Sequence, residues 1–160
     1  NLMIQLLQIV MKKLNKKPFD VALYLLGYRA LSEYEIENKL KQKEYEKDEI
    51  EETIKKLKYY GYINDEQLGD EVFYSLKQRK VYGDSYIHSK LKYRGLSSNL
   101  HLSVSEEMEF AKNVINTKLH ITNVDIKTKR KVAGFLSRRG FRTTVIYLIL
   151  EKLKDNKFTK

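Results

Sequence analysis

Three seven-residue stretches decide the fold of this chain: KLKQKEY at residues 39–45, KLKYRGL at residues 90–96 and FLSRRGF at residues 135–141. Aligning them brings three leucines into register, 51 and 45 residues apart: Leu40, Leu91 and Leu136. The match continues four residues before and five residues after each leucine, at Ile36, Ile87 and Val132 and at Tyr45, Leu96 and Phe141. Recurrence at this spacing is typical of tandem helical repeats, so the sequence predicts three repeats of three helices each.

Helix signals fill the rest of the chain. Proline occurs once, at Pro18, the seven glycines fall mostly where helical patterns stop, and alternation at period two is nowhere sustained. Capping boxes, in which a side chain and a glutamate three residues later bind the first-turn backbone, are expected at Ser32 with Glu35, Asp48 with Glu51 and Ser103 with Glu106. Further helices are expected over residues 2–14, 20–30, 65–80 and 106–119. The chain is therefore predicted to be all-α.

The repeats divide the chain into four parts. Residues 1–18 form an N-terminal helical segment, interpreted as the remnant of a longer region or of a further repeat, and the three repeats occupy residues 19–63, 64–105 and 106–160. Each unit is too small to bury its own apolar faces fully. Stacking end to end should therefore give an elongated, curved molecule with a continuous narrow core, in which the three aligned leucines are equivalent buried residues.

Composition excludes several classes of protein. With 42% hydrophobic and 32% charged residues, the chain can bury a core and is not a disordered tail. Its most apolar stretches, residues 2–11 and 145–150, are too short to span a bilayer. There is no cysteine and no visible secretory signal, which favours a cytoplasmic protein without disulfides.

The net charge of +10 favours an anionic partner, with nucleic acid or a nucleoprotein as the natural candidate. The alternative is a well-solvated, lysine-rich surface. Charge is unevenly distributed, because acids outnumber bases over residues 31–60, whereas over residues 123–142 seven bases face only Asp125. This polarity suggests a binding end and a solvated end.

No catalytic, metal-binding or cofactor-binding constellation can be assembled. The three histidines, His88, His101 and His120, are scattered along the sequence without a His-Glu pair at helical spacing. No glycine-rich phosphate loop and no nucleophile elbow occurs. The carboxylate pairs, such as Glu106-Glu107, lie at the starts of predicted helices, where acidic side chains stabilise the helix by interacting with its dipole. This structural role is favoured over acid-base catalysis. We therefore expect neither an enzyme nor a cofactor, and no metal site.

From about Ala22 to Leu153 the chain resembles the RecX family of bacterial regulatory proteins. The most specific matching pieces are the turn Gly61-Tyr62-Ile63-Asn64-Asp65, the series Gly83, Ile87, Leu91, Gly95 and Leu96, and FLSRRGF with Ile146. The last is similar to the family's arginine-arginine-glycine-aromatic signature. The resemblance implies a monomeric regulator that binds RecA filaments, inhibits their recombinase, ATPase and co-protease activities in DNA repair and the SOS response, and binds single- or double-stranded DNA weakly.

The sequence departs from the repeat pattern at a few positions. Glu44 stands where the other two repeats have Gly95 and Gly140, so the first inter-helix turn is expected to be built differently. Gly69 occupies a position that suits a better helix former, and Thr128 stands where Ser32 and Gly83 stood. The segment before Pro18 has no clear counterpart in short family members.

Basic side chains are the candidate partner-binding residues. Arg138, Arg139 and Arg142 surround the Gly140 turn, where forked guanidinium groups can meet carboxylates or phosphates, and we expect all three to be exposed and to contribute little to stability. The supporting bases are Lys129, Arg130, Lys131, Lys90, Lys92 and Arg94. Tyrosines among these bases can stack on nucleobases, but sealing of inter-helix seams is the favoured interpretation.

One alternative from another functional class stays open. Three-helix units can present a recognition helix to the major groove, so the chain can also be interpreted as a stand-alone nucleic-acid-binding protein. Lysine and arginine suit phosphates, and no cluster of Asn or Gln marks a recognition helix. Such binding would be weakly sequence-specific and steeply dependent on salt.

Overall fold

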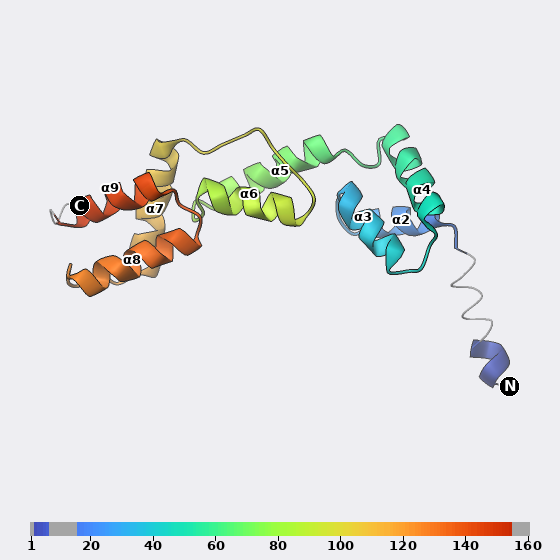
Figure 1. Cartoon of the computed structure of the whole chain (residues 1–160), viewed down its shortest axis with the longest axis horizontal. Helices are drawn as coiled ribbons and strands as arrows, with labels where there is room; N and C mark the ends of the chain where they lie inside the picture. Colours follow the sequence, from blue (N-terminus) through green and yellow to red (C-terminus); the bar gives the residue numbers. More distant parts are fainter. Residues whose placement is uncertain (1, 7–15, 155–160) are drawn as a thin grey trace. The chain divides into compact units, whose positions relative to one another are not determined.

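The structure is a computed structural model that describes residues 2–6 and 16–154. Within these ranges every regular element is helical: residues 2–6, then α2 (Pro18–Leu26), α3 (Glu33–Lys41), α4 (Lys47–Tyr59), α5 (Asp65–Lys77), α6 (Asp84–Tyr93), α7 (Val104–Lys118), α8 (Ile126–Arg138) and α9 (Thr143–Lys154) (Figure 1). None of the described helices is both long and apolar enough to cross a membrane. The all-α prediction is confirmed, while the helix expected over residues 2–14 lies mostly outside the described residues.

Contacts divide the chain into two compact units, Asn1–Leu68 and Gly69–Lys160, with the division inside α5. Helices α3 and α4 fall in the predicted first repeat, α5 and α6 in the second, and α8 and α9 in the third. Helix α2 begins at Pro18, one residue before the first repeat, and α7 begins at Val104, two residues before the third. The repeat boundaries at residues 19–63, 64–105 and 106–160 remain predictions, as does the end-to-end stack.

In the first unit, α2 and α3 both pack against α4 around a core that includes Ile36, Leu40, Ile50 and Leu57 (Figure 1). The Asp65 carboxylate accepts a hydrogen bond at 3.0 Å from the backbone N of Glu33, the first residue of α3. Partial burial raises the pKa of Asp65 above its usual value. An acid at the start of α5 thus caps the N-terminus of α3.

The three aligned leucines are buried, with 0% exposure for Leu40 and Leu136 and 1% for Leu91. Each is followed by the same turn, in which the residue five positions later donates its backbone N–H to the leucine carbonyl oxygen. The N to O distances are 3.3 Å for Tyr45, 2.9 Å for Leu96 and 3.2 Å for Phe141. This is the hydrogen bond that closes a helix through a left-handed residue, and it confirms the register of the repeats.

The left-handed residue of this turn corrects one expectation. Its φ is 70° at Gly95 and 73° at Gly140, and Glu44 adopts 64° at the equivalent position. The first turn is therefore built in the same way as the others, and the expectation of a different turn is wrong. The repeated hydrogen bonds hold a residue with a side chain in a conformation that costs it about 1–2 kcal/mol.

Two of the three predicted capping boxes are confirmed. Ser32 pairs with Glu35 at the start of α3, and Ser103 pairs with Glu106 at the start of α7. At α4 the box predicted at Asp48 and Glu51 is wrong by two residues. The helix begins at Lys47, directly after the left-handed turn, so that Glu49 accepts the hydrogen bond from the Glu46 backbone N at 3.1 Å.

The second repeat holds two helices, α5 and α6, where the sequence predicted three. Residues 96–103, which we call the extended segment, form no helix where α4 and α9 stand in the first and third repeats, and Leu96 and Leu102 within them are buried. A Cβ atom at Gly69 in α5 would lie 2.1 Å from the Ser97 carbonyl oxygen. Glycine is therefore required at this helix-interior position, because the extended segment approaches the α5 backbone.

We expect Leu91→Ala to destabilise the protein by about 2–5 kcal/mol in chemical denaturation, because the side chain is buried and its removal leaves a cavity. Leu148→Ala is the matched control, since Leu148 on α9 is 38% exposed and its replacement should cost much less. A loss below about 0.5 kcal/mol for Leu91→Ala would show that the repeat alignment does not describe the core.

Candidate functional site

The nine predicted partner-binding residues all lie in the second unit, on α6, on α8 and in the turns that follow them. Five of these side chains are exposed: Lys90, Lys92, Arg130, Lys131 and Arg138. The other four are partly buried: Arg94, Lys129, Arg139 and Arg142. The structure therefore separates five exposed cations from four partly buried ones.

Arg142 belongs to the second kind. Its Nε lies 3.0 Å from Oε2 of Glu107, its Nη2 donates to the Leu102 carbonyl oxygen at 2.6 Å, and its side chain is only 36% exposed. The expectation that Arg142 is exposed and contributes little to stability is wrong. Its guanidinium is used to compensate a buried carboxylate.

That carboxylate, Glu107 on α7, is fully buried. Its Oε1 accepts a hydrogen bond from the backbone N of Asp84 at 2.6 Å, and its Oε2 accepts one from the backbone N of Arg142 at 3.3 Å. Glu107 therefore joins the first turn of α6 to the chain that enters α9. The sequence predicted only that Glu107 is an acidic residue near the start of a helix, because the neighbouring residues give no sign that its side chain is buried.

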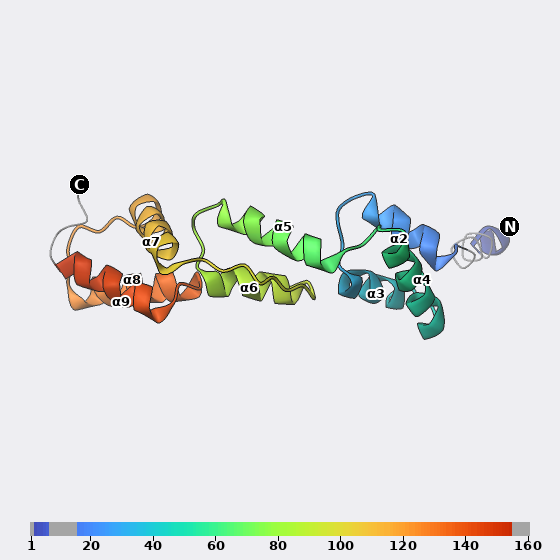
Figure 2. The ribbon, with the colours of Figure 1, turned by 90° about the horizontal axis from the view of Figure 1, so that it is seen from above.

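The Arg139-Gly140 turn at the end of α8 binds the start of α6 through backbone atoms. Gly83 N donates to the Arg139 carbonyl oxygen at 2.8 Å, and Ser85 N donates to the Gly140 carbonyl oxygen at 3.3 Å. Figures 1 and 2 show this end of α8 meeting the start of α6. A Cβ at Gly83 would lie 2.2 Å from Gly140 O, and one at Gly140 would lie 2.2 Å from Tyr86 N. The arginine-arginine-glycine-aromatic signature therefore packs the end of α8 against the start of α6.

Aromatic rings surround the same junction. Tyr82 and Tyr86 stack on each other with ring centroids 4.0 Å apart. The Arg139 guanidinium lies 4.6 Å from the Phe135 ring centroid, and the Lys90 ammonium lies 5.2 Å from that of Tyr86. These contacts hold both cations in place and support the interpretation that the tyrosines seal an inter-helix seam.

The exposed cations of α8 form a stripe. Lys127, Lys131 and Arg138 are four and seven residues apart, so they share one helix face, and Arg130 lies beside them. All four are exposed, and none has an ion-pair partner among residues 2–6 and 16–154. We call these four residues the α8 basic stripe. Lys127 was not among the predicted site residues, although its helical spacing could have identified it.

Two further cations meet where no spacing in the sequence predicts it. Lys112 on α7 lies near Lys152 on α9, and the charge of Lys152 lowers the pKa of Lys112 below its usual value. Helices α7 and α9 pack together, which brings these residues close across some forty positions of chain.

Comparison with known proteins decides the family. The domain described as "RecX, first three-helix domain" matches residues 19–57. The Regulatory protein RecX of Pelodictyon phaeoclathratiforme is 32% identical over 139 residues, which cover 82% of this chain and 86% of that protein. The chain belongs to the RecX family. RecX from Lactobacillus salivarius, known from a crystal structure, is 23% identical with a TM-score of 0.67, over 86% of this chain and 95% of that one, and shares the fold.

RecX proteins differ in length. The Regulatory protein RecX of Oceanobacillus iheyensis is 26% identical over 151 residues, which cover 89% of this chain and 56% of that protein. The chain therefore spans little more than half of that relative. Membership of the RecX family establishes a regulatory protein with the helical-repeat fold.

We expect Arg142→Ala to destabilise the protein by about 2–4 kcal/mol in denaturant titrations. Removing the guanidinium leaves the fully buried Glu107 carboxylate without its counter-ion, and the cost is somewhat below that of a wholly buried pair because Arg142 reaches solvent. Arg138→Ala removes the same group from an exposed position and is the matched control. Equal stabilities of the two variants would contradict the structural role of Arg142.

We also expect Gly140→Ala to be more destabilising than Gly61→Ala. Both glycines have φ of 73°, so both substitutions carry a conformational cost of about 1–2 kcal/mol. Nothing lies within 4 Å of a Cβ at Gly61, whereas the one at Gly140 meets the Tyr86 backbone, which should add about 1–3 kcal/mol. Thermal or chemical unfolding of the two variants measures the difference in stability. Similar losses of stability would show that the backbone around Gly140 and Tyr86 can move to accommodate a Cβ atom.

Proposed function

We propose that this chain binds RecA nucleoprotein filaments as a monomer and inhibits their recombinase, ATPase and co-protease activities. The observation that carries the proposal is the relation to the Regulatory protein RecX of Pelodictyon phaeoclathratiforme over most of both chains. The α8 basic stripe supplies a surface suited to an anionic nucleoprotein, since its four cations are exposed and form no ion pair within 4.0 Å in the described part of the chain.

The geometry of the stripe supports this use. Val132 and Leu136 bury the opposite side of α8, so the stripe faces away from the core that holds the helix in place. The Arg138 guanidinium lies 3.2 Å from where a Cβ of Gly134 would stand. The missing side chain therefore lets Arg138 lie along the helix surface. A rigid helix that presents long cationic side chains can bind phosphates or carboxylates with little loss of its own structure.

Replacing three stripe residues with glutamate tests the proposal. We expect Arg130→Glu, Lys131→Glu and Arg138→Glu together to weaken inhibition of RecA ATP hydrolysis on single-stranded DNA at least about tenfold, and to flatten its salt dependence, because fewer counterions are exchanged on binding. Helicity and thermal midpoint should change little, since all three side chains are exposed. Inhibition is measured by titrating each protein against a fixed amount of filament at several salt concentrations.

The control makes the same change of net charge in the first unit, at the exposed residues Lys17, Lys43 and Lys55. If both triple variants lose inhibition equally, net charge rather than the stripe governs binding. If the wild-type protein at near-stoichiometric amounts leaves ATP hydrolysis unchanged, the regulatory proposal fails. The stand-alone nucleic-acid-binding protein is then favoured only if the chain retards naked DNA in a salt-dependent manner.

A further inference from the structure

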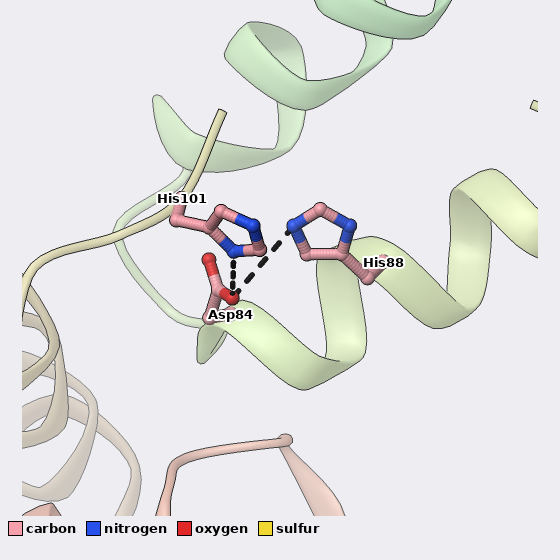
Figure 3. A group of neighbouring side chains, drawn as sticks. All are labelled: Asp84, His88 and His101. Atoms are coloured by element: carbon pink, nitrogen blue, oxygen red, sulfur yellow. Dashed lines mark hydrogen bonds and ion pairs between the residues drawn. The ribbon is translucent and has the colours of Figure 1, made fainter. Parts of the chain in front are cut away.

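Two of the three histidines lie together beside one carboxylate in the second unit. Asp84 and His88 are four residues apart on α6, so both side chains lie on one helix face, and His101 reaches them from the extended segment after α6 (Figure 3). The imidazole rings of His88 and His101 are stacked with centroids 4.5 Å apart. The sequence suggested that the three histidines are scattered, but His88 and His101 lie together in the structure.

The distances within this cluster suit coordination of a metal ion. His101 Nδ1 lies 2.8 Å and His88 Nε2 lies 3.7 Å from Oδ2 of Asp84, and one ligand atom from each of the three residues lies within 4.8 Å of the others. Around a metal with bonds near 2.1 Å, neighbouring ligand atoms are about 3.0 Å apart in octahedral geometry and about 3.4 Å apart in tetrahedral geometry. Small side-chain adjustments would bring all three atoms to one ion.

The carboxylate is already oriented for this role. Its Oδ1 accepts a hydrogen bond at 2.6 Å from the backbone N of Leu102, which leaves Oδ2 directed at the two imidazoles. His88 Nε2 also lies 3.0 Å from the Leu100 carbonyl oxygen. This contact is within hydrogen-bonding distance, so metal binding through Nε2 would replace it and release any proton that the nitrogen carries.

We propose that Asp84, His88 and His101 bind one divalent transition-metal ion of the zinc class. Two imidazoles and one carboxylate are the donor set that such ions prefer, whereas magnesium and calcium prefer oxygen ligands alone. The three residues line an open depression of about 430 Å³, where water can complete the coordination shell.

The surrounding charges do not forbid a cation. Of the other charged groups that line the depression, Glu107 and Arg142 neutralise each other in their ion pair, and Lys92 is exposed to solvent. Asp84 adds one negative charge at the cluster itself. The metal ion would fasten the extended segment, through His101, to the first turns of α6 and so stabilise the second unit.

Titration of the whole chain with zinc chloride, followed by calorimetry and by the thermal midpoint, tests the site. We expect one equivalent to bind and the midpoint to rise, because only the folded chain brings the three ligands together. His88→Ala and His101→Ala should each weaken binding at least about tenfold, whereas His120→Ala, at a histidine outside the cluster, should leave it unchanged. Calcium and magnesium should not compete.

The outcomes separate a built site from casual binding. His101 is 63% exposed, so its alanine variant is expected to fold even if the His88 variant does not, and circular dichroism checks both. No zinc binding at about 1 mM metal, or binding of equal strength in the His101 variant, overturns the proposal. Loss of binding only in His120→Ala also overturns it, because the ion would then be adventitious. A cobalt titration that gives the absorption of nitrogen-bound Co(II) in wild type and not in His101→Ala supports it.

Discussion

The second unit depends on a single buried carboxylate. Glu107 is surrounded by protein on all sides, yet its two oxygens accept hydrogen bonds from the starts of two other segments and pair with the Arg142 guanidinium. A buried charge is tolerated only when such partners offset its lost hydration. One side chain therefore links α7 both to the start of α6 and to the chain that enters α9, in addition to the direct packing of α7 on α9. A comparable device occurs in the first unit, where Asp65 accepts from the first amide of α3.

Local signals were enough to predict most of the helices and their turns. Each of these signals involves residues within five positions of one another, so its geometry is encoded in a short stretch of sequence. The signals are the turn that follows each aligned leucine, the serine capping boxes and the glycines at left-handed positions. Glu44 shows the limit of this reasoning. Composition alone suggested another turn, but three surrounding backbone hydrogen bonds impose the common one: Lys43 to Leu40, Glu44 to Lys41 and Tyr45 to Leu40.

The site could be predicted only in part, because its character depends on contacts between distant segments. The sequence identified the basic residues of α8 other than Lys127. It gave Arg142 the same role as Arg138, because the burial of Glu107 thirty-five positions earlier leaves no trace in the sequence near Arg142. Asp84 and His88 share a helix face and could have been paired from their spacing. His101 could not, because its approach requires an extended segment where the repeat pattern predicts a helix.

The glycine contact between α6 and α8 has a consequence for divergence among related chains. Gly83 and Gly140 meet through backbone atoms, so the contact is insensitive to the identity of most neighbouring side chains, while either glycine resists replacement. The exposed cations of the α8 basic stripe make no comparable backbone contact. A lineage can therefore gain or lose surface charge on this helix without rebuilding the framework that carries the charge.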